Sequence, residues 1–234
     1  IKTLDELEKH NKEYVLLSNA PRPNFSVKKF LIKMGISENI SNKVYTSGQA
    51  SLDYLLKNFK DKKFFHLGPA RDFDLFDSFK INKVNEIKKC VYIICTGLFD
   101  DHNQDLNYYK KMLNEEINKK MICTNPDLVV DRGEKREYCA GSVAKIFEEL
   151  GGRVEYFGKP YANVYSQSIE IENKRVLCIG DNLNTDIRGA NMQNFSSLLI
   201  SNGIHKKELE NKNQNDLFKQ YNVNVDYTQN NLKW

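Results

Sequence analysis

Long hydrophobic runs are absent from this sequence of 234 residues, and no apolar stretch reaches the roughly 20 residues that a membrane-spanning helix needs. The first residues, IKTLDELEKHNKEY, have neither the basic start nor the apolar centre of a secretory signal peptide. No long basic block is present, and the formal net charge is only +4. These absences argue against a membrane protein and against a nucleic-acid partner, and we expect a cytoplasmic location.

Cysteine pairs with metal-ligand spacing are also missing. The chain has five cysteines, an odd number, and most of them lie in apolar segments, so we expect reduced thiols. Neither a G-x-G-x-x-G loop nor a Walker loop occurs, and no linker rich in Pro, Gly or Ser divides the chain. Residues 208–231, rich in Asn and Lys, are interpreted as a solvated surface segment.

What the sequence does contain is an alternation of short apolar runs and amphipathic stretches. Hydrophobic residues make up 40% and charged residues 28%, as in ordinary globular proteins. The expected strands are rich in β-branched and aromatic residues, and the expected helices lie between them. This rhythm predicts an α/β fold with a parallel sheet. The expected strands are YVLL, KVYT, KFFHL, CVYIIC, KMIC, RVEYF, RVLCI and SLLI, and the expected helices span about 26–34, 49–58, 106–118 and 141–149.

Polar residues follow three of the expected strands. Ser18 and Asn19 come after YVLL, where a hydroxyl and backbone amides can receive an anion, although a plain turn explains the same residues. Lys159 projects from the strand end after RVEYF. The alternative interpretation is that it is an ordinary solvated lysine at the surface. Asp181 follows RVLCI and Asp186 comes where the next helix begins, so a turn and a helix cap are the plainer interpretation of this pair.

Taken together, these residues indicate a binding site, because ligands of open parallel sheets bind beyond the carboxyl ends of the strands. An anion-receiving serine, a lysine and two carboxylates at three such ends predict a site for a phosphate and a divalent cation. Mg²⁺ prefers hard oxygen ligands and commonly uses one or two carboxylates with phosphate oxygens and water.

The segments LLSNAPRP, FGKPYANVY and IGDNLNTDIRGA resemble motifs two, three and four of the haloacid dehalogenase superfamily of phosphohydrolases. CTNPDLVV and its spacing to GKP are similar to the class IIA, NagD-type branch of that superfamily. The resemblance covers nearly the whole chain. It implies a Rossmann-like core of parallel strands, an inserted α/β cap, and Mg²⁺-dependent hydrolysis of a small phosphorylated metabolite through an aspartyl-phosphate.

The resemblance also implies roles for individual residues. Ser18 would hold a phosphoryl oxygen, and the backbone amide of Asn19 would assist it. Lys159 would neutralise the nucleophile and the phosphate. Asp181 would bind Mg²⁺ directly, and Asp186 would support the metal through water.

The same resemblance predicts the domain organisation. Residues 1–67 would form the first part of the core without its N-terminal strand, residues 68–153 the cap, and residues 154–234 the second part of the core. In the cap, Thr124, Asn125 and Asp127 are candidate substrate contacts, with an ordering turn as the alternative. Arg132 and Arg136 could meet an anionic leaving group or lie solvated at the surface. The oligomeric state stays open, and a homodimer formed through the cap is compatible with the resemblance.

One part of the family pattern is not found. The superfamily nucleophile lies in an Asp-x-Asp motif before the serine segment, and no such motif precedes Ser18. We therefore expect that a strand upstream of Ile1 is missing and that the chain as it stands is inactive. Two other functions stay open, a non-catalytic module that binds a phosphate ligand or a partner, and a nucleotide-binding α/β domain of another type.

Overall fold

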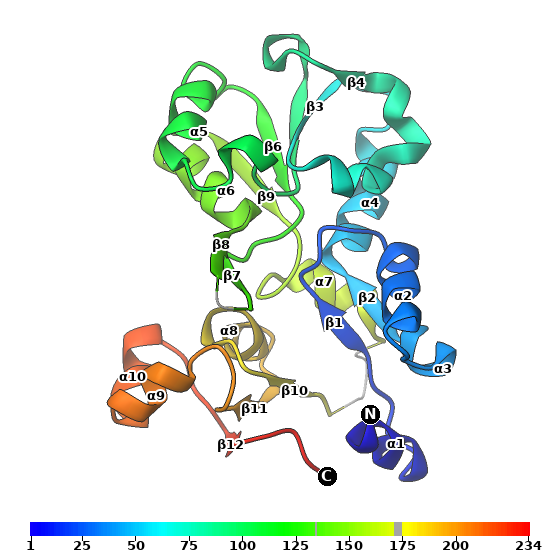
Figure 1. Ribbon diagram of the computed structural model, residues 1–234, viewed down its shortest axis with the longest axis vertical. Helices are drawn as coiled ribbons and strands as arrows, with labels where there is room; N and C mark the ends of the chain where they lie inside the picture. The colour runs from blue at the N-terminus through cyan, green and yellow to red at the C-terminus, as the bar shows by residue number, and fades with distance from the viewer. Residues whose placement is uncertain (134, 171–174) are drawn as a thin grey trace. The chain divides into compact units, whose positions relative to one another are not determined.

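The computed structural model describes residues 1–133, 135–170 and 175–234, which form two compact units (Figure 1). The first unit combines Ile1–Val15 with Lys159–Trp234, and the second spans Leu16–Gly158. Each unit contains a parallel sheet flanked by helices. The predicted α/β fold with a parallel sheet is therefore confirmed.

The largest sheet lies in the second unit and has five parallel strands in the order β4-β3-β5-β6-β9. Its three inner strands are short and mostly apolar, as expected for a parallel sheet that is covered on both faces. They are β3 (Phe64–Leu67), β4 (Lys83–Val84), β5 (Tyr92–Cys95), β6 (Lys120–Cys123) and β9 (Arg153–Tyr156).

Alternate side chains of this sheet enter two separate hydrophobic clusters. Ile93 and Met121 pack on one face with α5 (Leu106–Leu113) and α6 (Ala140–Glu149). Ile94 and Ile122 pack on the other face with α4 (Ser47–Asn58) and η1 (Ala70–Asn82), a 3₁₀ segment. The sheet is therefore the middle layer of three, as the second unit in Figure 1 shows.

A two-stranded parallel sheet also belongs to the second unit. It pairs β1 (Leu16–Ser18) with β2 (Val44–Thr46), and α2 (Asn24–Lys33) and α3 (Glu38–Ser41) connect the two strands. An antiparallel pair, β7 (Val129–Arg132) and β8 (Lys135–Tyr138), follows β6. Two short 3₁₀ turns, η2 (Ile87–Lys89) and η3 (Asp100–His102), complete the unit.

The first unit contains a three-stranded parallel sheet in the order β10-β11-β12. Leu183, Ile187, Leu199 and Leu217 form its buried cluster. Its elements are α1 (Lys2–Lys9), α7 (Ala162–Ser168), β10 (Leu177–Gly180), η4 (Leu183–Ile187, a π-helical turn), α8 (Arg188–Met192), β11 (Ser196–Ile200), α9 (Lys206–Asn211), α10 (Gln214–Tyr221) and β12 (Tyr227–Gln229).

The chain end that looked like solvated surface has regular structure. Most residues of α9 and α10 are exposed, as expected, but Leu217 is fully buried and β12 pairs with β11. The five cysteines are all free thiols. Among the described helices, none has the length and apolar character needed to cross a bilayer.

The predicted domain boundaries stay a prediction. The five-stranded sheet contains β3, which precedes residue 68, and β9, which extends beyond residue 153. Side chains of α4, from the segment assigned to the core, cover one face of that sheet.

Candidate active site

An ion pair joins two of the predicted site residues in the first unit. Lys159 Nζ lies 2.7 Å from Asp186 Oδ1. The two side chains are only 17% and 10% exposed, so water screens their attraction less than at an open surface. Lys159 is therefore held in place and is not a freely solvated lysine.

Asp186 also organises the loop after β10. Its second oxygen, Oδ2, accepts hydrogen bonds from the backbone amides of Asp181 at 3.2 Å and Asn182 at 3.1 Å. Gly180 permits this approach, because a Cβ there would lie 2.1 Å from the Asp186 Cγ. The carboxylate thus links the lysine to the backbone that carries Asp181.

Asp181 is half-buried at the end of β10, where the sequence predicted it. Its Oδ2 accepts a hydrogen bond of 3.0 Å from the backbone amide of Ile204. Gly203 lies against the same carboxylate, since a Cβ at this glycine would come within 2.2 Å of Oδ2. Within the described residues no hydrogen bond engages Oδ1, so this oxygen is available to a ligand.

In the second unit, the segment after β1 packs against the segments after β6 and β9. Asn19 is buried, and its Nδ2 donates a hydrogen bond of 3.0 Å to Asp127 Oδ1. Gly158 has φ +115°, and a Cβ there would lie 2.7 Å from Asn19 Oδ1 and 2.8 Å from Pro126 Cδ. Ser18 Oγ accepts from the amide of Ala20 at 3.1 Å, which shapes the turn.

The other predicted cap contacts order their own loop. Thr124 is fully buried, and its hydroxyl donates to the Cys95 carbonyl at 3.2 Å. The Thr124 carbonyl accepts from Ser47 Oγ at 2.6 Å. Asn125 Oδ1 accepts from the Asp127 amide at 3.0 Å, as in an Asx turn. These contacts favour the ordering-turn interpretation for Thr124 and Asn125.

The structure does not test the predicted role of the two arginines in the antiparallel pair. Arg136 lies in β8 with an exposed side chain. The side chain of Arg132 is outside the described part of the chain. Their predicted role in binding a leaving group stays a prediction.

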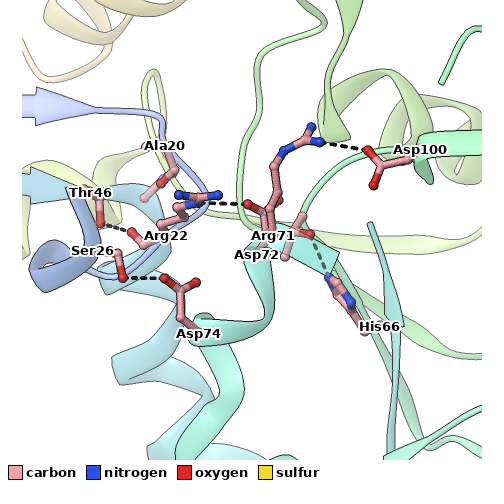
Figure 2. Close-up of polar contacts among 11 residues, drawn as sticks. Ala20, Arg22, Ser26, Thr46, His66, Arg71, Asp72, Asp74 and Asp100 are labelled. Atoms are coloured by element: carbon pink, nitrogen blue, oxygen red, sulfur yellow. Dashed lines mark hydrogen bonds and ion pairs between the residues drawn. The ribbon is translucent and has the colours of Figure 1, made fainter. Parts of the chain in front are cut away.

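Sequence reasoning missed a polar pair in the same unit, shown in Figure 2. Arg22 Nε donates to Asp72 Oδ1 at 3.1 Å, and the Arg22 carbonyl accepts from Thr46 Oγ1 at 2.6 Å. Burial raises the pKa of Asp72, and the Arg22 guanidinium opposes that rise. The pair fixes the loop after β1 to η1, and the arginine within SNAPRP was the available signal.

The donor set for a metal is limited. Among the residues that the structure describes, no group of three or more His, Cys, Asp or Glu side chains could hold a metal ion. Asp186 has both oxygens engaged by protein donors, whereas Asp181 has one oxygen available. Asp181 fits the single carboxylate that Mg²⁺ uses in many phosphate sites.

Comparisons with known proteins place the chain in a family. A family model described as haloacid dehalogenase-like hydrolase matches residues 1–82, and a second, described as HAD-hydrolase-like, matches residues 156–226. A crystal structure of a haloacid dehalogenase-like hydrolase from Brucella suis 1330 superimposes with a TM-score of 0.78 at 30% sequence identity, covering 86% of this chain and 78% of that one. The protein belongs to the haloacid dehalogenase-like hydrolase family.

More distant structures share the fold of this family member. A 4-nitrophenylphosphatase from Thermotoga maritima has a TM-score of 0.73 at 22% identity, with 98% of this chain and 85% of that chain covered. A putative NagD protein has a TM-score of 0.64 at 24% identity, with 85% and 79% covered. No curated protein matches the chain.

The expectation that a nucleophile strand is missing upstream of Ile1 is not borne out. The resemblance to the haloacid dehalogenase superfamily itself is confirmed.

Proposed function

We propose that this family member is a Mg²⁺-dependent phosphomonoester hydrolase that acts on a small phosphorylated metabolite. The observation that supports it most is the buried ion pair between Lys159 and Asp186 beside the half-buried Asp181. Family membership supplies the hydrolase class, and one structure that shares the fold is named a nitrophenylphosphatase.

Lys159 supplies the fixed positive charge of the proposed site. Phosphoryl transfer requires cationic groups that face the oxygens on which negative charge accumulates. Asp186 holds the ammonium group at 2.7 Å, which fixes the position of this positive charge. The lysine thereby stabilises the transition state without having to reorganise.

Ser18 and Asn19 receive the phosphate in this proposal. Ser18 Oγ accepts from the Ala20 amide, so its hydroxyl hydrogen can donate to a phosphoryl oxygen. The side chain of Asn19 is held by Asp127, which keeps the backbone after β1 in one conformation. The backbone amide of Asn19 is then a second donor to the phosphate.

Asp181 is the residue that would hold Mg²⁺, and Asp186 would support it indirectly. A bound Mg²⁺ would withdraw charge from the phosphoryl oxygens. The amide of Ile204 fixes one Asp181 oxygen, which orients the other toward a ligand. The aspartyl-phosphate step is carried over from the family resemblance, and we assign no residue of this chain as its nucleophile.

Thr124, Asn125 and Asp127 position the substrate only through the loop that they order, and Asp127 does so by its bond to Asn19. The cytoplasmic location and the homodimer stay predictions.

Hydrolysis of a panel of phosphate monoesters, with and without Mg²⁺, tests this proposal. We expect phosphate release that depends on Mg²⁺ and falls in Lys159→Ala. A protein that binds inorganic phosphate but releases none from any ester would instead be a phosphate-binding module.

A further inference from the structure

The five-stranded sheet has a topological switch point. The chain passes from β3 to β4 on one side, and then returns to place β5 on the other side of β3. In open parallel sheets, ligands bind in the crevice outside the carboxyl ends of the strands at such a point. For this sheet that position is beyond the ends of β3 and β5.

A pocket of about 350 Å³ lies at this position. The loop after β3, residues 68–70, and the loop after β5, residues 99–101, both line it. His66, Phe73 and Lys83 line it as well. None of the residues assigned above to phosphate or metal contributes to its lining.

The charges around the pocket are of both signs. Lys83 Nζ lies 4.2 Å from the centroid of the Phe73 ring, and it is the cationic group of the lining. Asp100 and Asp101 line the pocket too, and Asp100 is paired with Arg71 at 2.8 Å (Figure 2). Two carboxylates disfavour a phosphate group, whereas a lysine together with an aspartate suits a zwitterion.

His66 contributes a hydrogen-bond acceptor. His66 Nε2 lies 2.8 Å from the hydroxyl oxygen of Thr96, which can accept from the Nε2–H of one imidazole tautomer. In this tautomer Nδ1 is an acceptor on an imidazole that lines the pocket.

The imidazole stays neutral over the working range of pH. Burial, and to a lesser extent the charge of Lys83, lower the pKa of His66 to about 3. Phe73 packs edge-on against His66 with ring centroids 5.2 Å apart, and Phe99, in the loop after β5, also lines the pocket. The pocket thus combines aromatic walls, one acceptor and charges of both signs.

We propose that this pocket binds a small aromatic α-amino acid. Its carboxylate pairs with Lys83, its ammonium group donates to Asp101 and to His66 Nδ1, and its ring packs against Phe73 and Phe99. Pockets of this size enclose small ligands, and a few fixed polar groups set their orientation. This inference is independent of the proposed hydrolase activity.

Isothermal titration calorimetry with phenylalanine tests the proposal on the whole chain. Phenethylamine lacks the carboxylate, 3-phenylpropionate lacks the ammonium group, and glycine lacks the ring. We expect phenylalanine to bind and each of the three analogues to bind at least about tenfold more weakly, because each loses one set of contacts.

Substitutions locate the binding. Lys83→Met and Asp101→Asn should each weaken phenylalanine binding by about tenfold or more. Lys80→Met should leave it unchanged, because Lys80 pairs with the exposed Asp77 and lies outside the pocket lining. The side-chain NMR signals of His66 in the unsubstituted protein should shift on addition of phenylalanine. This measurement does not require that any variant folds.

Absence of binding by phenylalanine, tyrosine, tryptophan and histidine at millimolar concentration would overturn the proposal. Equal affinities for phenylalanine and its three analogues, or unchanged His66 signals, would overturn it too. Phosphate release is not measured in this experiment, so its outcome does not depend on the proposed hydrolase.

Discussion

Asp186 places one carboxylate oxygen 2.7 Å from Lys159 Nζ and the other 3.2 Å from the backbone nitrogen of Asp181. One buried side chain therefore fixes both the cation and the loop that carries the candidate metal ligand. The orientation of Lys159 and that of Asp181 depend on the same residue. Substitutions at these three positions should nevertheless have different effects.

Lys159→Ala should lower the turnover of phosphate esters by about 100-fold or more, because the transition state loses a fixed positive charge. The fold should persist, since the Asp186 carboxylate keeps its two amide donors. Steady-state kinetics and circular dichroism check both parts. Lys207→Ala, an exposed position in the same unit, is the matched control and should behave as the unsubstituted protein.

Asp186→Asn and Asp181→Asn should differ in stability. The amide of an asparagine at 186 cannot accept from Lys159 and from the two backbone amides together, so we expect a loss of about 1–3 kcal/mol in the free energy of unfolding. Asp181→Asn keeps an acceptor for the Ile204 amide and should cost less, but it should weaken Mg²⁺ binding and abolish turnover. Thermal unfolding and Mg²⁺ titration distinguish them. Full activity in Asp181→Asn would contradict its assignment.

Gly158→Ala should destabilise the second unit. A residue with a Cβ at φ +115° is strained, and this Cβ would also press on Asn19 and Pro126. The expected cost is about 1–3 kcal/mol from the backbone alone, with the contacts adding to it. Gly151→Ala is the matched control, because it has φ +95° with no atom near its Cβ. Denaturant unfolding of both variants should show the larger loss at Gly158, and equal losses would refute the close packing against Asn19.

The buried imidazole of His66 should make stability depend on pH. Its pKa is lowered to about 3 from an ordinary 6.5. Below pH 6.5 the His66 side chain therefore binds a proton in the unfolded chain but not in the folded chain. The contribution is fully present above pH 6.5 and is lost as the pH falls toward 3. Between pH 7 and pH 5 the unsubstituted protein should lose about 2 kcal/mol more than His66→Gln. Denaturant unfolding at both pH values measures this, and parallel losses would argue against a buried neutral histidine.

Local pattern was enough for much of the fold. The apolar runs that became β3, β5, β6 and β11 are short and β-branched or aromatic, so their type followed from composition and spacing. The polar composition of the C-terminal segment gave no sign of α10 and β12. Leu217 is the single fully buried residue of α10, and burial is set by partners distant in sequence. Partners of this kind have no local signature.

For the candidate site, the positions of the residues were predictable, but their contacts were not. Lys159 and Asp186 were found by their place at strand ends, and their contact follows from the fold. The role of Asp186 as acceptor for two amides depends on the π-helical turn, which no spacing indicated. Thr124 looked like a substrate contact, although its hydroxyl is buried against the Cys95 carbonyl.

The central claim is that Lys159, held by Asp186, serves the hydrolysis of phosphate monoesters. Release of p-nitrophenol from p-nitrophenyl phosphate tests it most directly, measured with Mg²⁺, with a chelator, and in the Lys159→Ala variant. The account predicts hydrolysis with Mg²⁺, none with the chelator, and a fall of about 100-fold or more in the variant. Hydrolysis at the same rate in Lys159→Ala, or no release from any phosphate ester in the presence of Mg²⁺, would contradict it.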